Sequence, residues 1–138
     1  MLTPFVLLSI AWVTVASASE RRLVFDDLKD AKGSIKYLVF KGKDGFPDQA
    51  EKSFLQGSLP ATKAADGVVL LLPDDTYAVS VIHDQNDNGK LDTNFLGIPQ
   101  EGFGFSNNPR IFFGPPSFSS ASFDSKDIKV IKIQMKYL

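Results

Sequence analysis

The sequence predicts an all-β protein, a single antiparallel β-sandwich of about seven strands. Residues 76–83 and 131–137 alternate apolar and polar side chains with the two-residue period of a half-buried strand. Clusters of Gly, Pro, Asn and Asp separate the apolar runs, and such clusters mark turns. No sustained helical period occurs after residue 18. Short strands joined by frequent turns favour a sandwich over a helical or mixed fold.

Each expected strand has its own pattern. Residues 68–72 are a continuous apolar run, which suits a buried strand, and residues 46–56 leave room for one helical turn. In the last strand, Val130 is out of phase with Ile131, which predicts a β-bulge between them. A long loop-rich insertion follows the fifth strand. The expected strands are residues 23–28, 34–41, 58–64, 68–72, 76–83 and 128–137.

The composition fits one globular domain. The chain has 138 residues, of which 43% are hydrophobic and 22% charged, enough for a domain with its own core. A formal net charge of −1 indicates neither a nucleic-acid partner nor an anionic membrane partner. The sequence contains no cysteine, so no disulfide can form. Lys132 and Lys136 on the last strand oppose edge-to-edge pairing, and we expect a monomer.

Residues 1–18 have the features of a secretory signal peptide. The segment from Pro4 to Ala16 is uncharged and mostly apolar, and residues 16–18 form an A-x-A cleavage site. The apolar run is too short to span a bilayer comfortably. The alternative is a buried N-terminal strand or helix. We therefore expect a secreted or periplasmic domain of residues 19–138 that has no membrane span after removal of the signal.

Oxygen-bearing side chains after the fifth strand have the spacing of a calcium-binding loop. Asp84, Asn86 and Asn88 fall on alternate positions, and Gly89 follows at once. Calcium prefers six to eight oxygen ligands, a curled backbone directs alternate side chains inward, and glycine permits the sharp turn. The predicted calcium ligands are Asp84, Asn86, Asn88, Asp92 and the carbonyl of Lys90.

The match to an EF-hand loop is partial. Position twelve, where an EF-hand has a bidentate glutamate, is Phe95. Glu101 and Asn94 are the nearest candidates for the missing oxygens. The preceding residues 76–82 have a strand pattern, so the loop would lie on a β scaffold. The alternative is a metal-free hairpin turn, because turns use the same Asp, Asn and Gly residues.

The long stretch at residues 84–127 shows little alternation and is rich in Gly, Pro, Asn and Phe. A loop of this length is usually functional or held in place by another element. Its phenylalanines could plug one open end of the sandwich, or they could form an aromatic binding surface. The candidate ligand-binding residues are His83, Asn94, Phe103, Phe105, Asn107 and Phe113.

Several motifs characterise the second half of the chain: residues 77–79 leading into 83–94, then 97–99, 101–102, 104–107 and 113–118. Together they resemble an uncharacterised bacterial family of exported proteins, domain-of-unknown-function family 2141. The resemblance covers nearly all of the chain after the leader and is strongest from Tyr77 to Phe123. It implies a small secreted or periplasmic β-domain of immunoglobulin/transthyretin-like architecture. It implies no established activity.

Three functional hypotheses fit these features. The first is an extracytoplasmic module whose calcium-ordered loop binds a peptide, a glycan or a protein. The second is a small periplasmic hydrolase with His83, the only histidine, as its base. The chain has no cysteine and no G-x-S-x-G motif, and one histidine cannot build a usual zinc site. The third is a structural accessory domain without metal. We favour the first hypothesis and assign no catalytic residue.

Overall fold

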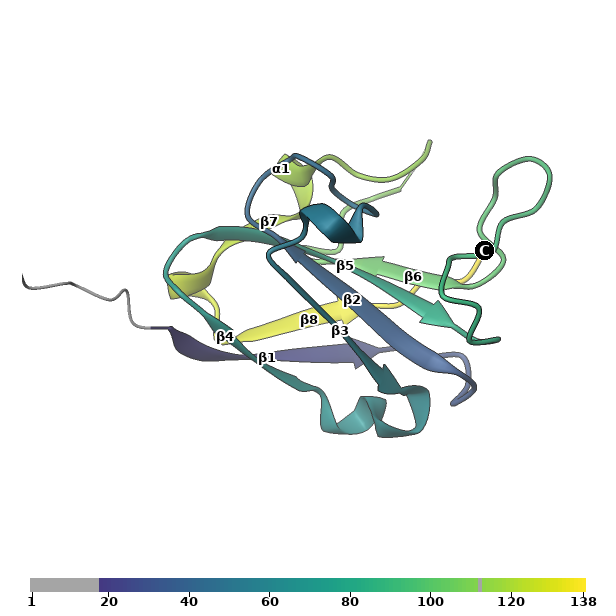
Figure 1. Ribbon diagram of the computed structural model, residues 1–138, viewed down its shortest axis with the longest axis horizontal. Helices are drawn as coiled ribbons and strands as arrows, with labels where there is room; N and C mark the ends of the chain where they lie inside the picture. The colour runs from purple at the N-terminus through teal and green to yellow at the C-terminus, as the bar shows by residue number, and fades with distance from the viewer. Residues whose placement is uncertain (1–17, 112) are drawn as a thin grey trace, which may run out of the picture.

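The computed structural model describes residues 18–111 and 113–138, which form two β-sheets packed face to face (Figure 1). The strands are β1 (Ser19–Asp26), β2 (Ser34–Phe40), β3 (Leu55–Pro60), β4 (Val68–Leu72), β5 (Thr76–Asp84), β6 (Gly102–Phe105), β7 (Ser122–Asp124) and β8 (Val130–Gln134). The short helices are η1 (Ala50–Lys52), η2 (Ala61–Asp66), α1 (Phe118–Ala121) and η3 (Ser125–Asp127). The predicted all-β sandwich is confirmed, with eight strands in the described part of the chain.

The expected signal peptide lies outside the described residues, apart from Ala18. In the part of the chain that the structure describes, no helix is both long enough and apolar enough to cross a membrane.

The first sheet has the strand order β4-β1-β8, and the second has the order β3-β2-β5-β6, with β7 paired to the start of β5. The pairs are antiparallel except β1 with β8, which is parallel, so the prediction of a wholly antiparallel sandwich is wrong at this pair. Two further bonds lie beside the start of this pair: the guanidinium of Arg21 donates to the carbonyl of Ser125 at 2.6 Å, and the backbone N–H of Arg22 donates to the carbonyl of Lys129 at 2.9 Å.

Several strand boundaries differ from the sequence prediction, and the expected bulge is absent. β1 begins at Ser19 and ends at Asp26, because Asp27 takes a positive φ of 63° that breaks the strand. β3 covers Leu55–Pro60 rather than residues 58–64, since residues 61–66 form η2. No bulge forms in β8, where Val130 is 45% exposed and the register with β1 is continuous. Val130 interrupts the alternation of apolar and polar residues in this strand because its side chain is exposed.

The core lies between the two sheets and is filled by alternate residues of the strands. The hydroxyl of the buried Tyr77 donates to the carbonyl of Pro73 at 2.7 Å, so this large aromatic side chain is buried without an unpaired polar atom. The fully buried core side chains include Leu23, Ile35, Val39, Leu72, Tyr77, Val79, Val81 and Ile133.

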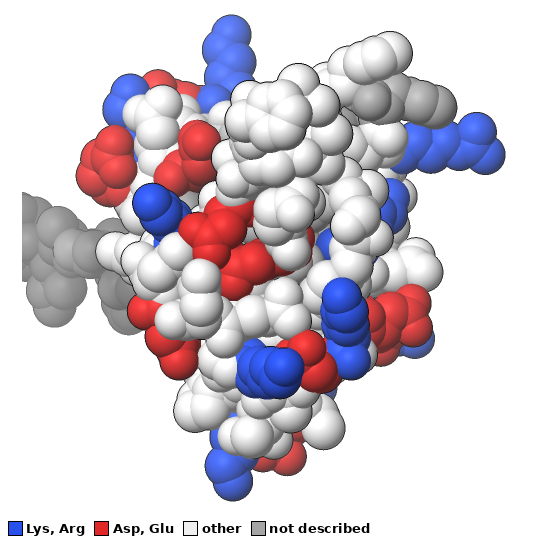
Figure 2. Space-filling model, turned by 90° about the vertical axis from the view of Figure 1, so that its right-hand side faces the viewer, with Lys and Arg blue, Asp and Glu red and all other residues white. Residues whose placement is uncertain are grey.

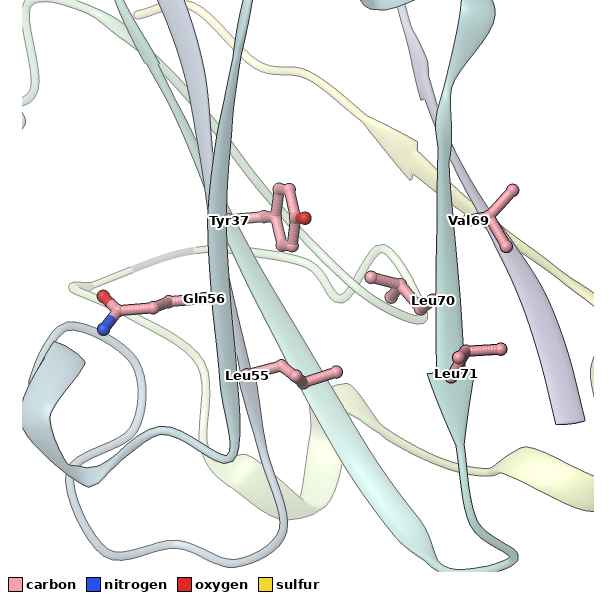
Figure 3. Close-up of a pocket in the computed structure, with 6 residues that line it drawn as sticks. All are labelled: Tyr37, Leu55, Gln56, Val69, Leu70 and Leu71. Carbon is pink, nitrogen blue, oxygen red and sulfur yellow. The ribbon is translucent and has the colours of Figure 1, made fainter. Parts of the chain in front are cut away.

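One side of the sandwich is closed and the other is open. On the closed side, Phe103 and Lys136 exchange two backbone hydrogen bonds of 3.0 and 2.8 Å, which join β6 to the segment after β8. On the open side, the edges of β3 and β4 face each other across a cavity of about 250 Å³. Figure 3 shows Tyr37 and Leu55 pointing across this gap toward Leu70.

Two adjacent leucines of β4 test this arrangement of the core. Leu72 is fully buried, whereas Leu71 is 58% exposed. We expect Leu72→Ala to lower the free energy of unfolding by about 2–5 kcal/mol, because it removes buried methyl groups and leaves a cavity. We expect Leu71→Ala to change it by no more than about 0.5 kcal/mol. Urea unfolding of both variants measures the difference, and equal losses would contradict the assigned faces of β4.

Candidate functional site

His83 and Asp84 end β5 on opposite faces of the second sheet. Successive side chains of a strand alternate between faces. His83 lies on the same side as Val81, inside the core, whereas Asp84 lies on the same side as Ile82. We call this second side, which points away from the core, the outer face. The two sequence neighbours therefore belong to different environments.

Asp84 organises the start of the loop that follows β5. Its side chain is fully buried. One carboxylate oxygen accepts the backbone N–H of Asn88 at 3.1 Å, and the other accepts that of Gly89 at 2.7 Å. These two bonds curl residues 85–89 back over the end of β5. The carboxylate is thus both desolvated and hydrogen-bonded, as a buried charge requires.

Glu101 joins the two ends of the same loop. It lies immediately before β6 and is 5% exposed. Its carboxylate accepts the backbone N–H of Gln85 at 2.6 Å and that of Asp92 at 3.1 Å. The first residue after β5 and the middle of the loop are therefore fixed to the start of β6. We call residues 84–101 the carboxylate loop.

The side chain of Asp92 lies in space between the side chains of Asn86 and Asn88. The amide nitrogen of Asn88 donates to one carboxylate oxygen at 2.5 Å, and that of Asn86 donates to the other at 2.6 Å. These hydrogen bonds, from Asn88 and then Asn86, lower the pKa of the Asp92 carboxyl below its ordinary value of 3.8. The predicted ligands Asn86, Asn88 and Asp92 are thus brought together.

The turn within the motif uses two left-handed residues. Gly89 has a φ of 84°, as expected for the glycine of a sharply turned loop, and Asp87 has a φ of 56°. The hydroxyl of Ser34, at the start of β2, donates to the Asp87 carboxylate at 2.5 Å. The turn is therefore attached to the neighbouring strand.

The carboxylate loop carries the types of oxygen-bearing group that hard cations bind; in this structure the amide nitrogens of Asn86 and Asn88 face Asp92, and their oxygens accept backbone N–H groups. Three carboxylates and two amide groups lie within a single hydrogen-bonded network, and the carbonyl of Lys90 belongs to the same turn. Among the described residues, no Lys, Arg or His nitrogen lies within 4.0 Å of the carboxylates of Asp84, Asp92 and Glu101. Calcium accepts carboxylate, amide and carbonyl oxygens in one site. In the described ranges, no three His, Asp or Glu side chains form a metal-binding group by themselves.

Acidic side chains gather at this end of the molecule. Figure 2 looks directly at the end where the carboxylate loop and the β1–β2 turn meet, and it shows a central acidic area with Lys and Arg farther out. Asp30 in the β1–β2 turn accepts the backbone N–H of Lys32, and this bond is the main cause that lowers the pKa of Asp30. The amide of Gln85 donates to the same carboxylate at 2.8 Å. The turn and the loop are thereby linked.

Asn94 shapes a hairpin and lies outside the network of the carboxylates. Its side-chain oxygen accepts the backbone N–H groups of Leu96 and Ile98 at 2.9 and 3.0 Å. Thr93 and Pro99 form a β-bridge at the base of this hairpin. Phe95, at its tip, is 95% exposed. The structure therefore places Asn94 in the turn of this hairpin, where its side-chain oxygen already has two backbone partners.

His83 is fully buried, and both of its ring nitrogens have partners. Nε2 is 2.7 Å from the carbonyl of Lys32, which can only accept, so Nε2 carries the proton in the neutral ring. Nδ1 is 2.6 Å from the hydroxyl of Tyr137, which donates to it. The ring of His83, a candidate ligand-binding residue, faces the core and holds the β1–β2 turn to the C-terminal segment.

A groove of about 1430 Å³ runs over the outer face. Leu38 of β2, Ile82 of β5, and Phe103 and Phe105 of β6 contribute to its floor. The carboxylate loop forms one wall of the groove. Beyond the floor, Phe46 packs against Phe40, Phe105 and Phe118 and covers the other end of the outer face.

The phenylalanines therefore divide between the two expected roles. Phe103 is 5% exposed and Phe105 is half-buried, and both still line the groove. Phe113 is fully exposed at its rim. Asn107 does not face the groove site: its amide donates to the carbonyl of Ser122, which fixes the turn after β6. Packed and exposed phenylalanines therefore coexist in this region.

The sequence analysis missed several residues of the groove and of its supports. Lys36 and Leu38 lie on the face of β2 that is turned away from the core. The alternation of side chains along residues 34–40 could have indicated this position. Asn108 accepts the backbone N–H of Gln134 at 2.8 Å and donates to the carbonyl of Lys132. No sequence pattern signals this contact, because it joins residues far apart in the chain.

Comparison with protein families assigns the chain. The family described as an uncharacterised protein conserved in bacteria, DUF2141, matches residues 24–132. The chain belongs to this family. The matched region runs from within β1 to within β8, and so includes the carboxylate loop and the floor of the groove. The predicted family resemblance is confirmed. No match was found among curated proteins or among solved structures.

Glu101 provides a test of how the carboxylate loop is held. We expect Glu101→Ala to lower the free energy of unfolding by about 2–4 kcal/mol, because the N–H groups of Gln85 and Asp92 both lose their acceptor. Glu101→Gln keeps one acceptor oxygen and should have a smaller effect. The exposed Glu51 of η1 is the control, and its alanine variant should change stability by less than about 0.5 kcal/mol. Equal losses in urea unfolding for Glu101→Ala and Glu51→Ala would refute this role.

The lowered pKa of Asp92 predicts that the folded protein loses stability at acid pH. Its folded pKa is below 3.8, so the carboxylate contributes stability that is fully present above pH 3.8 and is lost as the pH falls through the folded pKa. Thermal unfolding in chelator, measured between about pH 5 and about pH 2, should show a steeper acid loss for the native protein than for Asp92→Asn. Parallel curves would show that Asp92 makes no such contribution.

Proposed function

We propose that this protein is an extracytoplasmic binding module that holds a ligand in the groove on the outer face, with calcium stabilising the carboxylate loop that forms one wall. The observation that carries this proposal is the continuity between the loop and the groove. Leu91, Leu96 and Ile98 of the loop line the groove, and Asp84 and Glu101 anchor the same loop to the sheet. Order in the loop and the shape of the groove are thereby coupled.

The size and lining of the groove support a binding role. Small-molecule sites commonly have about 300–1,000 Å³ and are lined mainly by apolar side chains with a few polar groups. The groove has about 1430 Å³, so it can take a ligand larger than a typical drug-sized molecule. Its rim carries exposed Leu96, Ile98 and Phe113, and exposed apolar groups of this kind gathered in one place often indicate an interaction site.

The charges of the loop support calcium. Asp84 and Glu101 are buried carboxylates in one hydrogen-bonded network, and the ion pairs of the described residues include no cationic side chain beside them. Burying like charges without a counter-charge is costly. Asp84, Asn86, Asn88, Asp92, the Lys90 carbonyl and Glu101 would hold the ion. Calcium would supply the missing positive charge, and extracellular calcium modules function with weak sites.

The arrangement of the possible catalytic groups favours binding over hydrolysis. Both nitrogens of His83 are engaged inside the core. Ser106 is 1% exposed, donates to the carbonyl of Ala121 at 2.5 Å and accepts the N–H of Val79 at 2.8 Å. Nucleophilic catalysis requires a hydroxyl within hydrogen-bond reach of a base. Ser106 and His83 instead tie separate parts of the sandwich together.

Calcium-dependent stability tests the proposal. Differential scanning calorimetry of the purified protein, with calcium and with chelator, should show a higher Tm with calcium, because a ligand that binds only the folded state stabilises it by mass action. At about one hundred times the Kd, the expected gain is about 2.7 kcal/mol. Asp92→Asn should lose most of this gain.

Asp127→Asn is the matched control. Asp127 is an exposed aspartate of η3, which follows β7 at the opposite end of β5 from the carboxylate loop. This variant should keep the full calcium response. If the native protein shows the same Tm with calcium and with chelator, the calcium part of the proposal is wrong. If Asp127→Asn loses as much of the response as Asp92→Asn, the ion binds elsewhere.

A further inference from the structure

We infer that the groove binds a single-chain amphiphile with an anionic head group. This inference rests on the proposed function of the groove as a ligand site and adds the chemical class of the ligand. Three features carry it: an apolar floor, an apolar hairpin wall, and lysines that lie beside the floor.

The floor is apolar where strand register brings its side chains together. Ile82 is paired directly with Phe103, and Leu38 is paired with Ser80 in the next row of the sheet. The hydroxyl of Ser80 already donates to the carbonyl of Pro47 at 2.5 Å, so it is not available to a ligand as a donor. A floor of this kind offers contact area and few hydrogen bonds. That chemistry suits an alkyl chain better than a glycan, which needs many polar contacts.

The wall exposes apolar side chains that a chain-like ligand would cover. Leu96 is 69% exposed and Ile98 is 41% exposed, and both line the groove. The hydrogen bonds from their N–H groups to Asn94 hold them on a fixed hairpin. On the side of the C-terminal segment, Leu138 is 75% exposed and lines the same groove. Burial of these groups against an alkyl chain gains about 25 cal/mol per Å² of apolar surface.

The charged groups of the groove are mostly positive. Lys36, Lys90 and Lys136 line it, and Asp48 is the acidic residue among its described lining residues. Lys36 is paired with Ile82, and Lys136 is paired with Phe103, so these two lysines flank the apolar pair within one row of the sheet. The ammonium of Lys136 donates to the carbonyl of Pro109 at 3.2 Å, which directs it along this edge.

These lysines have no carboxylate partner among the described residues. The ion pairs there involve Lys41, Lys52 and Lys126, and none of the three groove lysines. Positive charge beside a low-dielectric apolar surface attracts anions. A carboxylate or phosphate head would therefore bind beside Lys36 or Lys136 while its alkyl chain covers Ile82 and Phe103.

Isothermal titration calorimetry with four probes of equal chain length tests the inference. The probes are decanoate, decyl phosphate, decanol and decyltrimethylammonium, each below its micelle-forming concentration. We expect the two anions to bind more tightly than decanol, and the cation to bind most weakly. Comparison of decanoate with decyl phosphate distinguishes a fatty-acid-like ligand from a lipid with a phosphate head.

Variants of the groove lysines test whether the affinity for the anionic probes depends on this groove. Lys36→Gln/Lys136→Gln should weaken decanoate binding by about tenfold, which is about 1.4 kcal/mol, and leave decanol binding unchanged. Lys63→Gln is the control, because Lys63 lies on η2 and does not line the groove. Equal affinities for decanoate and decanol, both unaffected by the lysine changes, would overturn the inference.

An uncharged apolar dye separates failure of the inference from failure of the proposed function. If Nile red binds and is not displaced by any of the four probes, the groove is a ligand site and the ligand is not an amphiphile. If Nile red and all four probes fail to bind, the groove is not a ligand site, and both proposals about it are wrong. Displacement of Nile red by decanoate or decyl phosphate at lower concentrations than by decanol is the result that supports the inference.

Discussion

The two buried carboxylates at the end of the second sheet determine how the rest of the functional region is arranged. Asp84 accepts the N–H groups of Asn88 and Gly89, and Glu101 accepts those of Gln85 and Asp92. A loop must satisfy its backbone polar groups when it packs against a protein surface. Here two side chains accept these bonds, Asp84 at the end of β5 and Glu101 immediately before β6. The loop is consequently held over one end of the sheet, and the middle of the outer face stays open as a groove.

The alternation of β5 links this loop to the core. Val81 and His83 face inward, where His83 joins the β1–β2 turn to Tyr137, while Ile82 and Asp84 face outward. The same strand therefore stabilises the sandwich with one set of side chains and builds the site with the other. A change in register of one residue would exchange these roles and would bury the wrong set. The core and the site consequently depend on one strand pairing.

Local sequence patterns predicted the features that depend on local chemistry. The alternation of residues 76–83 indicated β5, and the spacing of Asp84, Asn86, Asn88 and Gly89 indicated a tightly turned oxygen-rich loop. Patterns could not predict contacts between distant segments. The parallel pairing of β1 with β8 is one such contact, and so is the bond beside it between Arg21 and Ser125, which are 104 residues apart. The burial of His83 depends on Lys32 and Tyr137, and the position of Lys136 beside Phe103 depends on how the C-terminal segment closes one side of the sandwich.

Amide hydrogen exchange in the carboxylate loop tests the central claim most directly. The claim is that the carboxylates of Asp84 and Glu101 hold the loop to the sheet. It predicts that the amides of Gln85, Gly89 and Asp92 exchange at least about tenfold more slowly than that of the exposed Phe95, and that calcium slows them further. In Glu101→Ala, protection at Gln85 and Asp92 should be lost. Exchange of all these amides at the rate of Phe95 would contradict the account.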